Sequence, residues 1–344
     1  MSAVPLDFKS KFLATAVGSL PLQDSRQAVD FVFDVFAKHI PFWPQLPRCS
    51  YLEQMIVQYS EKLPGLLLDA SAKKISVDTQ SESYAEQLEE TFNKCQAQDA
   101  EYFGVSRPYA EGLYLFVQRL KALSWKGLAK AQVIGPLSLG LSLLDEHKNP
   151  ILYNPELREL LPLFLAQKAS WVARAIKATE TTRPIVFIDE PYLVAIGTAQ
   201  SGFSQGEFVQ SINLMVDAIH GQDALAGLHC CGNTDWEMVL ETRIDVLSFD
   251  AYGYLDKFLL YPKAFEDFSG RGGLLALGIV PNSQELLKKD LEQVLVDTLR
   301  RQPKLVKNGA LITPSCGCGN LSLDLSEKAH RLCVSLAHRL SAEF

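Results

Sequence analysis

The chain has 344 residues, 47% of them hydrophobic, and a formal net charge of −7. This length suits one large α/β barrel or two medium-sized domains. Nucleic acid is not expected as a partner, because phosphate binding needs clustered Lys and Arg and the sequence has no long basic run. No apolar stretch approaches the roughly 18 residues of a membrane span, and residues 1–9 do not resemble a secretion signal. We therefore expect a cytoplasmic protein without a membrane partner.

Eight short apolar runs bounded by Gly or Pro predict β-strands. They are residues 12–17, 42–46, 131–134, 184–188, 226–228, 245–249, 274–279 and 310–313. Amphipathic stretches with helical spacing lie between them, at 25–38, 52–63, 155–179, 204–220, 235–241, 282–301 and 325–342. Repeated strand-then-helix units predict a parallel sheet, and eight of them predict a closed (β/α)₈ TIM barrel. The long interval 73–126 predicts an insertion between strands 2 and 3, and the absence of any linker predicts one domain over residues 1–344.

Polar and reactive residues stand just after the predicted strands. They include Gly18-Ser19, Asp189-Glu190, His229 to Cys231, Asp250 and Cys316. In a TIM barrel all of these positions lie on the carboxyl face of the barrel, where catalytic groups collect. The shared position predicts that these side chains converge on one site.

Imidazole, thiolate and carboxylate groups at these strand ends form a ligand set that Zn²⁺ prefers. Side chains two apart in a strand point the same way, so His229 and Cys231 are expected to face one pocket while Cys230 points into the wall. Cys316 is the favoured ligand of the Cys316-Gly317-Cys318 segment. Asp250 is either a weak, displaceable ligand or a group that orients one.

Two further segments are candidates for binding a substrate. Asp189 and Glu190 follow a buried apolar strand, where acids are costly unless paired or used. Because side chains alternate along a strand, only one of the two acids should point into the pocket. There it would bind an ammonium group or act as an acid–base catalyst, and the alternative is a structural salt bridge. Gly18-Ser19 offers backbone N–H groups suited to a substrate carboxylate.

The chain resembles the cobalamin-independent methionine synthase family of the uroporphyrinogen decarboxylase-like superfamily. The matching pieces, in order, are Val17-Gly18-Ser19-Leu20-Pro21, Ile188-Asp189-Glu190-Pro191, His229-Cys230-Cys231, the apolar run ending at Asp250, Gly278-Ile279-Val280-Pro281-Asn282 and Pro314-Ser315-Cys316-Gly317. The resemblance implies a barrel that binds homocysteine as a zinc thiolate, without a protein nucleophile.

By position, the resemblance implies roles for individual residues. His229, Cys231 and Cys316 match zinc ligands, and Asp250 stands where the family has a glutamate ligand. The Val17, Gly18 and Ser19 segment and Asp189 match the residues that hold the carboxylate and the amine of the amino acid. Val57 stands where the family has its amine-binding glutamate, and Glu53, one helical turn away, is the candidate to bind the substrate in its place.

The resemblance also bears on the methyl donor. Val280 stands near the place of the family's proton-donor histidine, and the chain has room for one barrel rather than the two of the full-length synthase. A folate amine leaves poorly without protonation, whereas a methylcorrinoid departs as a cobalt species. We therefore expect a zinc-dependent methyltransferase that uses a methylcorrinoid, free or on a corrinoid protein, to methylate a small thiol, with homocysteine as the first choice.

Three alternatives stay open at this point. A uroporphyrinogen decarboxylase-like enzyme shares the fold but needs a cationic pocket, and the first strand has no Arg cluster. A methylcorrinoid:coenzyme M-type methyltransferase would use the same zinc chemistry on another thiol. A non-catalytic zinc- or corrinoid-binding protein would need the ligands alone.

Overall fold

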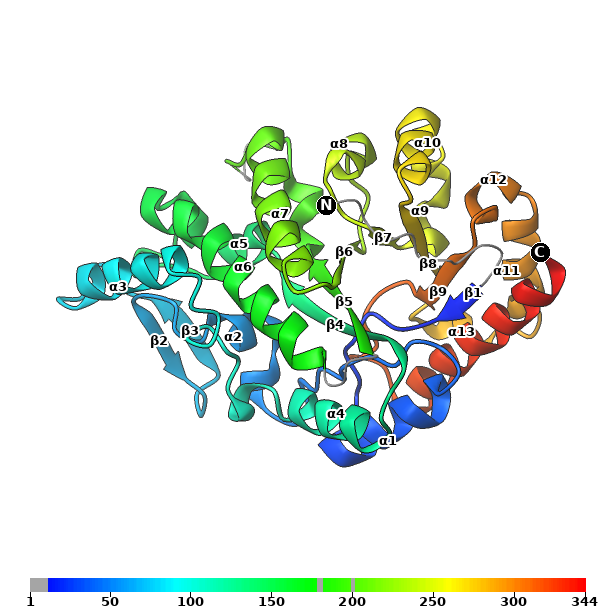
Figure 1. The fold of residues 1–344 in the computed structure, drawn as a ribbon, viewed down its shortest axis with the longest axis horizontal. Helices are drawn as coiled ribbons and strands as arrows, with labels where there is room; N and C mark the ends of the chain where they lie inside the picture. The colour runs from blue at the N-terminus through cyan, green and yellow to red at the C-terminus, as the bar shows by residue number, and fades with distance from the viewer. Residues whose placement is uncertain (1–11, 178–181, 199–201) are drawn as a thin grey trace.

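The computed structural model describes residues 12–177, 182–198 and 202–344. A parallel sheet of seven strands curls through the centre of the molecule in the order β1-β9-β8-β7-β6-β5-β4 (Figure 1). Its strands are β1 (Phe12–Ala14), β4 (Gly127–Ile134), β5 (Thr182–Asp189), β6 (Leu225–Cys230), β7 (Val246–Phe249), β8 (Leu274–Val280) and β9 (Ala310–Pro314). The α/β class and seven of the eight predicted strands are confirmed.

The predicted second strand, residues 42–46, is not a strand, and the sheet is not a closed eight-stranded barrel. The segment does lie between β1 and β4, where it makes only the isolated bridges Ser19↔Gln45 and Phe42↔Lys130. Its sequence explains the failure, because Pro41 and Pro44 lack the N–H groups that a ladder needs. Two prolines therefore interrupt the strand that would have closed the barrel.

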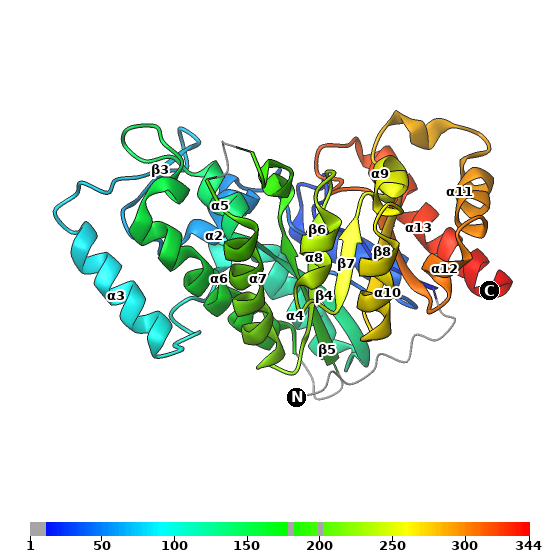
Figure 2. The ribbon, with the colours of Figure 1, turned by 90° about the horizontal axis from the view of Figure 1, so that it is seen from above.

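Helices cover the outside of the curled sheet (Figure 2). In the described residues they are α1 (Ser25–Phe36), α2 (Met55–Ser60), α3 (Tyr84–Gln96), α4 (Glu111–Ala122), α5 (Pro136–Ser142), α6 (Pro155–Ile176), α7 (Gln205–His220), α8 (Trp236–Glu241), α9 (Ala251–Phe258), α10 (Pro262–Gly270), α11 (Leu291–Arg300), α12 (Pro303–Val306) and α13 (Leu323–Glu343). Helix α6 packs on β4 and β5, and α13 packs on β1 and β9. Among these helices none is long and apolar enough to cross a membrane.

The expected insertion between the second and third predicted strands contains structure of its own. An antiparallel hairpin of β2 (Leu66–Asp69) and β3 (Lys74–Val77) is followed by α3 and α4. The hairpin and α3 lie at one end of the molecule in both views, and α3 packs against α6 (Figures 1 and 2). The insertion therefore extends the helical layer rather than the central sheet.

Two apolar clusters stabilise this arrangement. The larger one fills the space between the sheet and the helices. The smaller one, which we call the inner apolar cluster, consists of Ile40, Ile185, Phe187, Leu225, Val246, Leu274, Ala276 and Leu311. Apart from Ile40, its members lie on β5 to β9 at alternating strand positions, so they share the inner face of the sheet. They lie below the polar residues at the carboxyl ends of the strands.

Candidate metal centre

Polar side chains line the inner face of the sheet at the carboxyl ends of its strands. Asp189 on β5 pairs in register with His229 on β6, and His229 pairs with Ser248 on β7. All three side chains are buried. The carboxyl end of the sheet therefore holds a row of buried polar groups above the inner apolar cluster.

His229 is held through one of its two ring nitrogens. Its Nδ1 lies 2.9 Å from the hydroxyl oxygen of Ser248. Its Nε2 is buried and has no hydrogen-bond partner among the described residues. Leaving a buried polar atom unpaired costs about 1–3 kcal/mol, so Nε2 is a candidate ligand atom.

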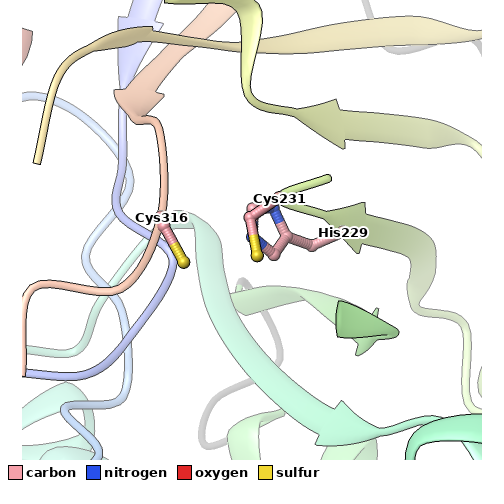
Figure 3. A group of neighbouring side chains, drawn as sticks. All are labelled: His229, Cys231 and Cys316. Carbon is pink, nitrogen blue, oxygen red and sulfur yellow. The ribbon is translucent and has the colours of Figure 1, made fainter. Parts of the chain in front are cut away.

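Cys231 and Cys316 complete a three-residue group with His229. Their ligand atoms all lie within 4.8 Å of one another. Cys231 follows the last residue of β6, whereas Cys316 comes from the loop after β9, and Figure 3 shows the side chains directed toward one another. The neighbouring Cys316 thiol lowers the pKa of Cys231, whereas the Cys231 thiol, together with burial, raises the pKa of Cys316. One thiol therefore ionises more readily than the other.

The neighbouring cysteines lie outside this group. Cys230 is buried, its Sγ lies 3.5 Å from the Gly232 carbonyl oxygen, and burial raises its pKa to about 12. Burial likewise raises the pKa of Cys318 to about 12. Each cysteine pair thus has one member in the group and one in the core.

Asp250 also lies outside the three-residue group in this structure. It caps helix α9, where its Oδ1 accepts a hydrogen bond of 2.7 Å from the backbone N–H of Gly253. Burial raises its pKa, and the backbone N–H groups of Gly253 and Tyr252 oppose that rise. A role as zinc ligand stays a prediction.

The two adjacent acids after β5 point in different directions. Asp189 Oδ1 is buried without a partner among the described residues, and burial raises the pKa of this carboxyl group while Lys130 and His229 oppose the rise. Glu190 turns instead to the N-terminus of α5. It accepts hydrogen bonds from Leu137 N at 3.1 Å, Ser138 N at 2.8 Å and Ser138 Oγ at 2.6 Å. Only Asp189 faces the inner side of the sheet.

The other proposed substrate-binding residues lie in two places. Val17, Gly18 and Ser19 form a turn after β1 beside the loop of Cys316, because Cys318 N donates to the Ser19 carbonyl oxygen at 3.1 Å. Glu53 is 1% exposed, and burial raises its pKa to about 8 against the effect of the backbone groups of Leu46 and Glu111. Glu111 begins α4, so the Glu53 carboxyl group lies near the start of that helix. Substrate binding by Glu53 stays a prediction.

Sequence reasoning missed a buried lysine and a buried glutamine on β4. The Nζ of Lys130 donates to the Val17 carbonyl oxygen and, at 3.0 Å, to Gln132 Oε1. Burial lowers the pKa of Lys130 to about 8, and Asp189 opposes that effect. The signal was available, because Lys130 and Gln132 interrupt an apolar run at the spacing of one strand face.

Comparison with known proteins bears on the fold. A crystal structure of a candidate vitamin-B12-independent methionine synthase from Listeria monocytogenes matches 96% of this chain and 98% of its own, with 15% identity and a TM-score of 0.50. The likeness shows a shared fold. A candidate fructose-1,6-biphosphate aldolase from Coccidioides immitis matches 67% of this chain and 83% of its own, at 12% identity and a TM-score of 0.28. No protein-family model and no curated protein matches the sequence.

Proposed function

We propose that this chain is a zinc-dependent S-methyltransferase that methylates a small thiol. The observation that carries the proposal is the convergence of one imidazole and two thiols, those of His229, Cys231 and Cys316, within 4.8 Å. The shared fold with the Listeria protein supports an enzyme of the methionine synthase type. We further propose that one domain, residues 1–344, carries the activity.

The residues present fit zinc. Two thiols and an imidazole are preferred zinc donors, and three protein ligands leave a fourth position for a substrate. The unpartnered Nε2 of His229 is free to bind the metal, while the hydroxyl of Ser248 fixes the orientation of the ring through its other nitrogen. When bound, zinc would lower the pKa of a substrate thiol so that the thiolate exists at neutral pH. Asp250 would tune this site as a displaceable fourth group.

Homocysteine is our first choice of thiol. Asp189 presents a buried, unpartnered carboxylate oxygen on the same face as His229, which suits an ammonium group. The turn of Val17, Gly18 and Ser19 would hold the carboxylate. These contacts would bring the substrate sulfur to the three ligands, so that rate is gained by orientation and no protein nucleophile is needed.

A methylcorrinoid is our choice of donor. Val280 is fully buried on β8 and its side chain has no proton to give. Without a general acid, transfer from methylfolate would lose on the order of 10²–10⁴ in rate. The Listeria protein is a candidate vitamin-B12-independent methionine synthase, so methylfolate is the rival donor that the test must include.

The test is an assay of the zinc-loaded protein with homocysteine, coenzyme M and other small thiols, each with methylcobalamin and separately with methylfolate. We expect methionine from homocysteine and methylcobalamin, in a reaction that stops when zinc is removed. Methylfolate should give little product, and Val280→His should raise that product. Cys318→Ala, whose thiol lies outside the three-residue group, should behave like the wild type.

Other outcomes would select the alternatives. Methylation of coenzyme M alone would change the substrate but keep the reaction. Zinc binding without methylation of any thiol would leave a zinc- or corrinoid-binding protein. Decarboxylation of a porphyrinogen by the zinc-free protein would identify the decarboxylase, and robust turnover with methylfolate would overturn the choice of donor.

A further inference from the structure

The turn after β1 is bonded directly to the loop that carries Cys316. Cys318 N donates to the Ser19 carbonyl oxygen at 3.1 Å, and Gly319 N donates to Ser19 Oγ at 3.2 Å. The second bond joins residues 300 positions apart in the sequence. Ser19 therefore binds the backbone immediately after the candidate ligand through both its main chain and its side chain.

Glycine in the loop allows this contact. A Cβ at position 317 would lie 2.3 Å from Ser19 Oγ, a separation that side-chain carbons do not tolerate. A Cβ at position 319 would lie 3.2 Å from both Cβ and Oγ of Ser19. The two glycines beside Cys318 thus bring the loop within hydrogen-bonding distance of Ser19.

The turn itself is fixed from its other side. Gln45 N donates to the Gly18 carbonyl oxygen at 3.0 Å, and Lys130 Nζ donates to the Val17 carbonyl oxygen. Gly18 has a φ of +144° and packs against Gln132, whose side chain leaves no room for a Cβ. The turn is therefore a rigid support for whatever binds to it.

Cys316 stands between two such supports. On its amino side, Ser315 N donates to the Val280 carbonyl oxygen at 2.7 Å, and Ser315 Oγ donates to Asn282 Oδ1 at 3.1 Å. On its carboxyl side, Asn282 Nδ2 donates to the Gly317 carbonyl oxygen at 3.4 Å, and Ser19 holds Cys318 and Gly319. The Ser19 contact uses a hydroxyl group from the turn after β1, at the other end of the sequence.

We propose that Ser19 is a positioning residue for the metal ligand Cys316, holding the loop so that the Cys316 sulfur faces His229 and Cys231. The inference rests on the metal site of the proposed function and adds a residue to its support. Groups that orient metal ligands typically change metal affinity by about 10–100-fold when removed. Because Ser19→Ala leaves the main-chain bond in place, we expect an effect near the lower limit, about tenfold.

The test is a double-mutant cycle of Ser19→Ala and Gly317→Ala, with zinc affinity measured by chelator competition. The thiolate-to-metal absorption band of the cobalt(II)-substituted protein reports the bound thiolates of Cys231 and Cys316, so a displaced Cys316 sulfur should reduce it to the contribution of Cys231. Each single variant should weaken zinc about tenfold and reduce the cobalt band. With Ser19→Ala, the atom nearest to a Cβ at position 317 is the Cβ of residue 19, at 3.5 Å, so Gly317→Ala should add little in the double variant.

A matched control separates this effect from general loosening. Ser322→Ala removes a hydroxyl that accepts one backbone N–H at 3.4 Å at the start of α13, just beyond the loop. It should leave zinc affinity and the cobalt band unchanged.

Two results would overturn the inference. If the wild type binds zinc through Cys316 but Ser19→Ala matches it in both readouts, Ser19 does not position the ligand and the metal site stands. If the wild type binds neither zinc nor cobalt, the inference and the proposed metal site fail together.

Discussion

The two ends of the inner face carry opposite chemistry on the same strands. On β5, Phe187 belongs to the inner apolar cluster, and Asp189, two residues on, carries a carboxyl group. The same change occurs from Val246 to Ser248 on β7 and from Leu311 to Thr313 on β9. Strand alternation keeps both members of each pair on one face.

The polar end contains buried polar atoms that lower the stability of the fold. Asp189 Oδ1, His229 Nε2 and Thr313 Oγ1 are buried without partners among the described residues, and all three stand at the polar end. Each such atom costs about 1–3 kcal/mol. The apolar end, whose side chains are all buried, supplies stability that the polar end does not, although Lys130 Nζ lies 5.1 Å from the ring centroid of Phe187 beside it.

The largest expected effect comes from the apolar end. Leu311→Ala should lower the free energy of unfolding by about 2–5 kcal/mol, because Leu311 is fully buried and the change leaves a cavity. Denaturant unfolding measures this, and zinc content per folded chain should not change. If Leu311→Ala lost zinc but kept its stability, the apolar end of the inner face would also support zinc binding at the polar end.

The paired acids after β5 provide the second test. Asp189→Asn should lower kcat/KM for homocysteine on the order of 10²-fold, because the ammonium partner is lost and the substrate is no longer oriented. Zinc content and melting temperature should be kept, since the replaced oxygen has no partner.

Glu190→Gln is the matched neighbour. Its carboxylate accepts three hydrogen bonds at the start of α5, so the change should cost about 1–3 kcal/mol of stability. If Asp189→Asn and Glu190→Gln changed activity and stability equally, the assignment of Asp189 to substrate binding and of Glu190 to the support of α5 would be contradicted.

A buried lysine away from the site gives the third test. Lys168 on α6 is fully buried, with Nζ 3.4 Å from the Phe103 carbonyl oxygen and 4.9 Å from the Phe164 ring centroid. Burial lowers its pKa from 10.5 to about 7. The folded chain therefore binds fewer protons than the unfolded chain between those values, so this lysine makes stability rise with pH across that window.

Lys168→Met should raise stability at pH 7 by on the order of 1–3 kcal/mol, and the gain should shrink toward pH 10. Melting temperatures of both proteins at pH 7 and at pH 9.5 measure the difference, and methyl transfer should be unaffected. If Lys168→Met were less stable than the wild type at pH 7, interactions of the Lys168 ammonium group would offset the cost of its burial.

The smallest effect is expected at Asp250. Asparagine is as good a helix cap as aspartate, so Asp250→Asn should keep stability within about 0.5 kcal/mol. We expect most zinc to remain and methyl transfer to fall by less than about tenfold, since a carboxylate that only tunes the site is lost. Complete loss of zinc, measured by elemental analysis, would make Asp250 a primary ligand.

Local pattern was enough to predict much of this site. Period-two alternation put His229 and Cys231 together and left Cys230 aside, and the strand-end rule added Cys316 from a distant segment. The prediction of strands from short apolar runs failed at residues 42–46, because it gave no weight to the two prolines that prevent a strand there.

Lys130 was overlooked because the predicted strand began one residue later, although its spacing from Gln132 already indicated one strand face. Other features depend on contacts that the sequence does not show. The Ser19 contact joins segments 300 residues apart and requires the loop geometry itself. Asp250 could be placed at a strand end, but its use as a helix cap follows from how the chain turns afterwards.

Zinc stoichiometry in variants of two cysteine pairs, one adjacent and one separated by Gly317, tests the central claim most directly. Cys231→Ala and Cys316→Ala should each lose most zinc by elemental analysis while far-ultraviolet circular dichroism shows the fold intact. Cys230→Ala and Cys318→Ala should each keep about one zinc per chain, because their thiols lie outside the three-residue group. Full zinc occupancy in both Cys231→Ala and Cys316→Ala would contradict the assignment of this group as the metal centre.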